Sequence, residues 1–451
     1  MSKSAPHLEL DVARSRRAPF DLDSLTWQAL YEHYNSQPEL QAFAPDGHYA
    51  RDPRDDEMTV FNEQRARRPH DYAESAGETR TAGTPRSATP GDEAPRDEAP
   101  RDEAPRDEAP GDEAPGDEAP GDARSCPICA GETTPIIDIE PLSEGFTFIN
   151  QNLYPIFTPN RTAHAPGGST SEPPPFPAAS AASVRPVPAS SAPSAPSAPS
   201  APSAPSAPSE PSVPSVLSGP AKGAHFLHWT SSYHERDWPE LDQPDRLCAM
   251  RRIALLEERL LGLPDFPEPP ERRYVSIIKN VGRSVGGSLS HGHQQITLSN
   301  RPPRRVGDHQ RFAARTGSTY AQFMNRENPD ELTVARLSTG TLLVPYFMRR
   351  PYDLQFVLRS ATGTYVHELG RDELNDFARA LALGMEAMRA VLARLGKEVA
   401  YNVLFHTGRG SGVYLEFLPH TQEEGGFERL GLSACQGNPR KAAATLREIL
   451  S

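Results

Sequence analysis

The stretch YVSIIKNVGRSVGGSLSHGHQQITLSN, residues 274–300, decides the fold. Its two ends, 274–280 and 293–300, are rich in β-branched, aromatic and alternating apolar residues, which predicts two strands. Between them lies a turn rich in glycine and serine. The whole stretch therefore predicts an antiparallel strand pair whose connection carries polar side chains.

The same kind of pattern continues toward the end of the chain. Apolar residues at helical spacing predict helices at 245–263 and 370–396. Further strand pairs are predicted at 341–347 with 352–360 and at 401–408 with 412–419. The order strand, strand, helix, strand, strand predicts an α+β fold with an antiparallel sheet and helices packed on one side.

Two low-complexity tracts interrupt this pattern. Residues 91–120 repeat GDEAP and RDEAP, and residues 189–209 repeat Ser-Ala-Pro. The surrounding stretches 85–124 and 161–220 hold half of the 48 prolines, and 85–124 carries −8 of the net charge of −13. Neither has enough large apolar residues to offset chain entropy, so we expect disordered insertions over 72–124 and 160–220. A docking role for these tracts is the functional alternative.

Three ordered pieces remain: 1–71, the island 125–159, and 221–451. A segment as short as the island cannot bury a core of its own, so we expect it to dock onto the rest of the domain. Both insertions would then be surface loops within one domain.

Composition excludes several classes of protein. No run of about 18 apolar residues is present, which argues against a membrane span, and the first residues have no apolar signal region. Four cysteines do not make a disulfide framework and suit a reducing, cytoplasmic compartment. No basic stripe with interleaved aromatics occurs, so nucleic acid is not the expected partner.

The strongest chemical signal is NVGRSVGGSLSHGHQQ, residues 280–295. On a strand, His291, His293 and Gln295 point to the same side, so we expect them to line one wall. The glycines of the turn let backbone amides approach an anion closely; they are Gly282, Gly286 and Gly287. This arrangement suits attack of a neutral imidazole on phosphorus.

The second signal is CPIC, in which Cys126 and Cys129 form half of a zinc site. Cys248 and Cys435 are isolated, so histidines must complete a tetrahedron. A redox pair and two ordinary thiols are the alternatives to a metal site.

These residues resemble the galactose-1-phosphate uridylyltransferase family of the histidine-triad superfamily. The shared motif is met by Asn280, Gly282, Gly286, Ser288, His291, His293 and Gln295. The resemblance extends over most of the ordered chain and implies two histidine-triad repeats. The first would comprise 1–71, 125–159 and the catalytic part 221–315, and the second, degenerate repeat would be 316–451.

The resemblance implies roles for the motif residues. His293 is the expected nucleophile that takes a nucleoside monophosphate, and Gln295 hydrogen-bonds a phosphate oxygen. Hydrolytic relatives usually carry a third histidine in place of this glutamine, so Gln295 favours transfer. The remaining substrate-binding candidates of the motif are Asn280, Gly286, Gly287 and Ser288.

The family's structural zinc site uses a C-x-x-C pair, a later histidine and the first His of the motif. Cys126, Cys129 and His291 fill three places, and His234 in SSYHERDWPEL, 231–241, is the candidate for the fourth. His225 and His228 are alternative ligands, and a purely structural His234 is the other interpretation. We expect zinc, rather than chain continuity, to fix the island to the catalytic sheet.

Further matches lie outside the motif. RARRP, 65–69, resembles a family segment whose arginines face the nucleotide, which makes Arg65 and Arg68 candidates; the alternative is a solvated basic turn. FTFINQN, 146–152, resembles a family segment in which Asn150 would contact ribose or base. Gln151 stands where the family has Asp.

The second repeat departs from the family, because Tyr414 and Glu416 stand where the family usually has His-x-His. The implied function is a nucleotidyltransferase of carbohydrate (galactose) metabolism that uses a nucleotide sugar and a sugar phosphate. The alternatives are a hydrolase or phosphorylase of nucleotides such as dinucleoside polyphosphates, and a zinc-stabilised nucleotide-binding protein without turnover. The family commonly forms homodimers; the sequence itself leaves dimerisation open.

Overall fold

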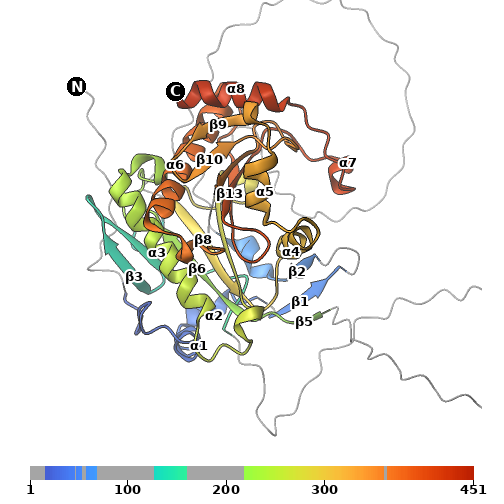
Figure 1. Ribbon diagram of the computed structural model, residues 1–451. Helices are drawn as coiled ribbons and strands as arrows, with labels where there is room; N and C mark the ends of the chain where they lie inside the picture. Colours follow the sequence, from blue (N-terminus) through green and yellow to red (C-terminus); the bar gives the residue numbers. More distant parts are fainter. Residues whose placement is uncertain (1–15, 46, 53–56, 69–125, 160–217, 360–362) are drawn as a thin grey trace, which may run out of the picture.

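A computed structural model describes residues 16–45, 47–52, 57–68, 126–159, 218–359 and 363–451 (Figure 1). Both repeat tracts, 91–120 and 189–209, lie outside these residues, and so do most of the two predicted insertions. The helices are α1 Trp27–Ser36, α2 Pro38–Ala42, α3 Gln243–Leu261, α4 Arg304–Thr316, α5 Tyr320–Glu327, α6 Arg371–Arg394, α7 Gly426–Arg429 and α8 Pro439–Leu450.

The described residues form a ten-stranded sheet and a separate sheet of three strands. The ten-stranded sheet has the order β3-β4-β6-β8-β7-β12-β13-β11-β10-β9, and each neighbouring pair is antiparallel. Its strands are β3 Ile136–Pro141, β4 Phe146–Gln151, β6 Gly223–Trp229, β7 Tyr274–Val281, β8 His293–Ser299, β9 Thr333–Arg336, β10 Gly340–Leu343, β11 Leu354–Leu358, β12 Tyr401–His406 and β13 Tyr414–Pro419. The α+β prediction is confirmed.

The sheet consists of two halves with the same topology. In each half, three strands precede a long helix and two strands follow it: α3 lies between β6 and β7, and α6 lies between β11 and β12. The halves meet where β7 pairs with β12, with Ile277 opposite Phe405 and Val281 opposite Tyr401. This repetition agrees with the two-repeat architecture expected from the sequence.

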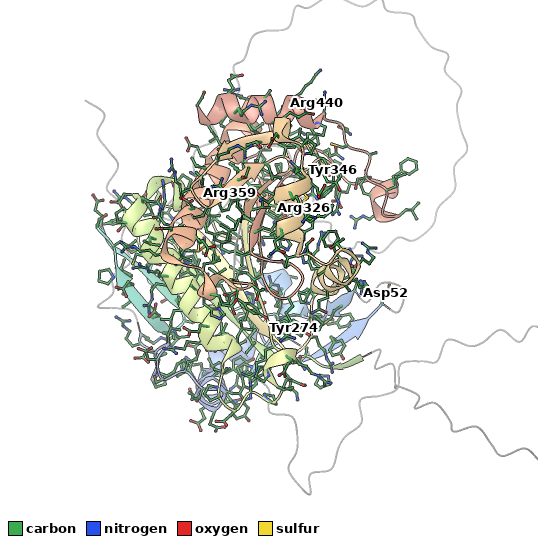
Figure 2. The ribbon with its side chains drawn as sticks, viewed as in Figure 1. Asp52, Tyr274, Arg326, Tyr346, Arg359 and Arg440 are labelled. Carbon is green, nitrogen blue, oxygen red and sulfur yellow. The ribbon has the colours of Figure 1, made fainter. Side chains whose placement is uncertain are left out.

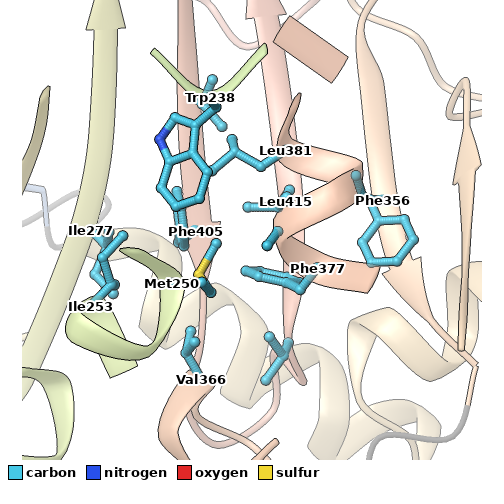
Figure 3. Close-up of a cluster of buried hydrophobic side chains, with 14 of the residues drawn as sticks. Trp238, Met250, Ile253, Ile277, Phe356, Val366, Phe377, Leu381, Phe405 and Leu415 are labelled. Atoms are coloured by element: carbon cyan, nitrogen blue, oxygen red, sulfur yellow. The ribbon is translucent and has the colours of Figure 1, made fainter. Parts of the chain in front are cut away.

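Helices α3 and α6 cover one face of the sheet, as Figure 1 shows. Apolar side chains from both helices and from alternate strand positions form the main core. A part of it is drawn in Figure 3, where Ile253 of α3 lies beside Ile277, and Phe377 and Leu381 of α6 lie beside Leu415. Because side chains alternate along a strand, the residues between these core positions face away from the helices. This second face carries the candidate site.

The island contributes β3 and β4 to one edge of the large sheet. Phe148 of β4 lies opposite Trp229 of β6, and the pairing runs on to Gln151 opposite Phe226. Docking of the island is therefore confirmed, and strand pairing is an attachment that the sequence analysis did not include. Backbone hydrogen bonds along β4 and β6 also attach it, since an added edge strand pairs its N–H and C=O groups with its neighbour.

The three-stranded sheet corrects one predicted boundary. Its strands are β1 His48–Arg51, β2 Met58–Val60 and β5 Ser218–Pro220, in the order β2-β1-β5. The sequence predicts that residues 218–220 belong to the disordered insertion 160–220, because they share its small-residue composition. They form β5 instead, because they pair with β1, which lies far away in the sequence.

Charged side chains lie on the outside of this framework. Figure 2 labels Arg326 and Arg440, both exposed, and these pair with Glu327 and Glu331 respectively. Exposed pairs of this kind contribute little to stability, so the fold depends mainly on the buried core. In the described part of the chain, no helix is both long and apolar enough to cross a membrane.

Gly384 gives a test of the packing between α6 and β13. A Cβ at this position would lie 2.2 Å from Cζ of Phe417, so Gly384→Ala should lower the free energy of unfolding by about 1–3 kcal/mol. Gly307, in α4, is the matched control, because a Cβ there meets only the flexible Arg311 side chain at 3.3 Å. Gly307→Ala should raise stability by up to ~1 kcal/mol. Thermal unfolding followed by circular dichroism compares both with the wild type; an unchanged midpoint for Gly384→Ala would contradict the packing.

Candidate active site and metal centre

The four predicted metal ligands lie together. One ligand atom from each of Cys126, Cys129, His234 and His291 lies within 4.8 Å of all the others. The sulfur of Cys129 is 3.6 Å from Nδ1 of both histidines, and the sulfur of Cys126 is 3.8 Å from Nδ1 of His291. Such a group could hold one metal ion.

The two ligand histidines are oriented by their other ring nitrogens. Nε2 of His291 lies 2.8 Å from the main-chain oxygen of Ser231, and Nε2 of His234 lies 3.1 Å from Oγ of Ser290. Donation from Nε2–H leaves Nδ1 unprotonated and facing the sulfurs, as metal-binding histidines require. The neighbouring Cys129 thiol and the two histidines lower the pKa of the Cys126 thiol far below its usual range, which favours the thiolate that binds metals.

The alternative ligands are engaged elsewhere. His228 is buried and contacts Thr147 Oγ1 at 3.0 Å and the side-chain amide of Gln294 at 2.7 Å. Nδ1 of His225 accepts from the backbone N–H of Ile156 at 3.2 Å. Neither belongs to the metal-ligand group, so His234 is the histidine that the fold brings to the cysteines. No disulfide joins Cys126 and Cys129.

His293 lies at the first residue of β8 and at the wall of a cavity of about 360 Å³. Nδ1 of His293 lies 2.8 Å from the main-chain oxygen of His291, and its ring packs against Trp229 with centroids 4.8 Å apart. Burial and the nearby charge of Lys279 lower the pKa of His293 to about 4. The imidazole is therefore neutral near pH 7, and its Nδ1–H bond leaves the Nε2 lone pair for chemistry.

The predicted wall of two imidazoles and an amide needs correction. Gln295 lines the cavity with His293, but His291 is not among the lining residues. The reason is that β8 begins only at His293. His291 precedes the strand, so its ring is directed to the cysteines and the alternation of a strand does not apply to it.

The glycine turn contributes less than the sequence indicated. The amide of Gly287 donates to the main-chain oxygen of Gly282 at 2.9 Å, and that of Gly286 donates to Arg283 at 3.1 Å. Both N–H groups are thus used within the turn, and neither glycine lines the cavity, whereas Ser288 does. Asn280 lies beside the turn, where its Oδ1 accepts from Asn402 at 2.8 Å.

Arginines and an asparagine from distant segments complete the site. Arg68 and Asn150 line the cavity, and the Asn150 oxygen accepts from the Trp229 indole at 2.9 Å. Arg65 donates to the main-chain oxygen of Tyr154, a lining residue, at 2.6 Å. Burial, followed by the charge of Arg68, lowers the pKa of Arg65 to about 10, so both arginines stay charged near pH 7.

Buried polar atoms without partners face this region. Within the described residues, Thr133 Oγ1, Gln151 Oε1 and Arg68 Nε are buried without a hydrogen bond, and all three residues line the cavity. Because buried polar groups are nearly always paired in folded proteins, these atoms make the cavity suited to a polar ligand or to ordered water. Sequence reasoning missed Thr133 and Trp229, since neither belongs to a recognisable spacing.

The corresponding strand of the second half carries no such arrangement. Tyr414 and Glu416 lie on β13, where Tyr414 OH is 2.9 Å from Nε2 of His309 and Glu416 Oε2 is 2.9 Å from Nε2 of His406. These side chains pair with one another in the described structure and are not part of its metal-ligand group. The two halves therefore share topology but differ in their polar side chains.

Comparisons with known proteins identify the fold. No protein-family model and no curated protein matches the sequence. Among solved structures, a GALT-like protein from Arabidopsis thaliana has a TM-score of 0.50 at 16% identity, covering 72% of this chain and 92% of its own. A uridylyltransferase has a TM-score of 0.44 at 18% identity, covering 52% of this chain and 76% of its own. An ADP-glucose phosphorylase from Arabidopsis thaliana with bound ADP-glucose has a TM-score of 0.43 at 18% identity, covering 50% of this chain and 72% of its own. The chain therefore shares its fold with this GALT-like protein.

Proposed function

We propose that this protein is a nucleotidyltransferase that works through a nucleotidyl-histidine intermediate. The observation that carries the proposal is His293: a buried, neutral imidazole with Nδ1 fixed, at the wall of a cavity that contains unpaired polar atoms and an arginine. A neutral imidazole in a fixed orientation is suited to covalent catalysis on phosphorus. The proposed substrates are a nucleoside diphosphate sugar and a sugar 1-phosphate.

In the first half-reaction, the Nε2 lone pair of His293 attacks the α-phosphorus. The bond from that phosphorus to the bridging oxygen breaks, and the sugar 1-phosphate leaves. The imidazole becomes positively charged, and the main-chain oxygen of His291 stabilises it through Nδ1–H. In the second half-reaction, a phosphate oxygen of another sugar 1-phosphate attacks the same phosphorus and releases His293.

The other lining residues have supporting roles. We propose that Arg65 and Arg68 offset the charge of the phosphates, that Gln295 and Ser288 donate to phosphate oxygens, and that Asn150 contacts the nucleoside. Asn280, Gly286 and Gly287 support the proposal indirectly, because they shape the turn before Ser288. A cytoplasmic, homodimeric enzyme of carbohydrate metabolism is part of the same proposal.

We propose zinc as the metal of the Cys126, Cys129, His234 and His291 group. Zinc bond lengths to sulfur and nitrogen with tetrahedral angles place those ligand atoms about 3.6 Å apart. This agrees with the 3.6 Å measured from Cys129 Sγ to each Nδ1. With four protein ligands the site is closed, so zinc would have a structural role: it would hold His291, whose main-chain oxygen in turn orients His293.

Removal of one ligand tests the metal proposal. We expect about one zinc per chain in the wild type and none in Cys126→Ser, measured by elemental analysis. Hydrogen exchange should accelerate over 126–135, whereas 146–151 should stay protected by its pairing with β6. Cys248→Ser, a change of the same chemistry away from the group, should keep its zinc. A zinc-loaded Cys126→Ser protein would contradict the assignment.

Covalent labelling tests the nucleotidyl transfer. With α-phosphate-labelled UDP-glucose or ADP-glucose, the wild type should carry acid-labile label, and His293→Ala should carry none. His309→Ala, which removes a buried histidine of α4 that contacts Tyr414, should still be labelled. An unlabelled wild type with measurable nucleotide binding would indicate a binding protein without turnover, and a labelled His293→Ala would remove His293 from the mechanism.

The acceptor is tested at Gln295. By the family resemblance, Gln295→His should convert transfer toward hydrolysis, raising the share of label released to water about tenfold, which corresponds to ~1.4 kcal/mol. Release of label is measured with water, phosphate or sugar 1-phosphates as acceptors. If the wild type already passes its label mainly to water or inorganic phosphate, the protein is a hydrolase or phosphorylase.

A further inference from the structure

Lys279 is a buried lysine that the proposed chemistry does not use. Its side chain, on β7, is 2% exposed, and its Nζ lies 2.7 Å from Oδ2 of Asp237. Nζ also donates to the main-chain oxygen of His293 at 3.2 Å. Lys279 lies two residues after the core residue Ile277, so it faces the helix-covered side of the sheet, behind the strand that bears His293.

Asp237 reaches the same point from the loop 231–241. It caps the short 3₁₀ turn Trp238–Glu240 by accepting from the Trp238 amide at 2.9 Å. A Cβ on Gly292 would lie 2.5 Å from Cγ of Asp237, so the carboxylate rests directly against the residue between the two motif histidines. Gly292 therefore permits this close approach.

The loop thus holds the His-Gly-His tripeptide at two points. His234, three residues before Asp237, lies beside His291, with ring centroids 5.3 Å apart. Asp237 lies beside Gly292, and Lys279 connects it to the His293 carbonyl. The main-chain oxygen of His293 is consequently held by Lys279 from the side of the strand opposite to the cavity. This contact does not involve the four candidate metal ligands.

Stability alone does not account for such a pair. Taking both charges out of water costs free energy, and replacing a buried ion pair by well-packed apolar residues is often neutral or stabilising. What an apolar pair could not supply is a donor to the His293 carbonyl. Small misplacements of a reacting group can reduce rates by two orders of magnitude, so a fixed carbonyl has a direct use in catalysis.

We propose that Lys279 and Asp237 form a positioning pair that holds the His293 main chain in register with the cavity. The inference rests on the proposed function and deepens it. It assigns these residues no contact with substrate, and they act only through His293.

The test uses the double variant Lys279→Met with Asp237→Leu, which replaces the pair by apolar side chains. We expect a near-wild-type unfolding midpoint, unchanged zinc content and KM, and a labelling rate reduced about 10–100-fold. The matched control is Glu257→Gln on α3. It removes a buried carboxylate whose Oε2 lies 2.9 Å from Nδ1 of His367. It should label at the wild-type rate.

Three results would overturn the proposal: a double variant that labels at the wild-type rate, one that does not fold, or an equal loss of rate in Glu257→Gln. Hydrogen exchange over 288–296 tests the positioning pair even if the proposed function fails, because the measurement requires no turnover. If the wild type is never labelled, faster exchange there in the double variant than in Glu257→Gln still supports the positioning pair. Unchanged exchange rejects it.

Discussion

The hydrogen bond from Nδ1–H of His293 to the main-chain oxygen of His291 connects the two sites of this protein. His291 is a metal-ligand candidate through its ring and an acceptor through its carbonyl, so whatever fixes His291 also fixes the tautomer and direction of His293. The candidate metal site and the candidate nucleophile are therefore parts of one arrangement within three residues.

Distant parts of the sequence reach that segment through the large sheet. Pairing of β4 with β6 brings Asn150 to the cavity from the island, and Arg68 comes from the N-terminal piece. The two repeat tracts separate these pieces in the sequence. Because only the ends of each tract must meet the sheet, long insertions between strands are compatible with an intact site; the entropic cost of loop closure grows slowly with length.

Local patterns predicted the parts of the site that depend on neighbouring residues. Spacing and composition sufficed to predict the strand pairs β7 with β8, β10 with β11 and β12 with β13, and they singled out the HGH motif and the CPIC pair, whose roles the family resemblance supplied. Thr133, Trp229 and Asp237 were missed because their roles depend on packing between remote segments. The expected role of the turn glycines in anion binding was too large, because a sequence does not reveal which acceptor an amide N–H will use. The N–H of Gly287 donates to the main-chain oxygen of Gly282. Likewise, only the onset of β8 at His293 decides that His291 faces the metal ligands.

The junction of β7 and β12 has a consequence for how the chain can be divided. Each half ends its sheet on a strand whose remaining backbone groups are paired by the other half, from Ile277 opposite Phe405 to Val281 opposite Tyr401. Severing the halves would turn two central strands into exposed edges, which are prone to pair with other chains and aggregate. The repeats are thus alike in topology but joined through their central strands, and the half without the candidate site pairs the strand that would otherwise be an edge of the half that carries His293.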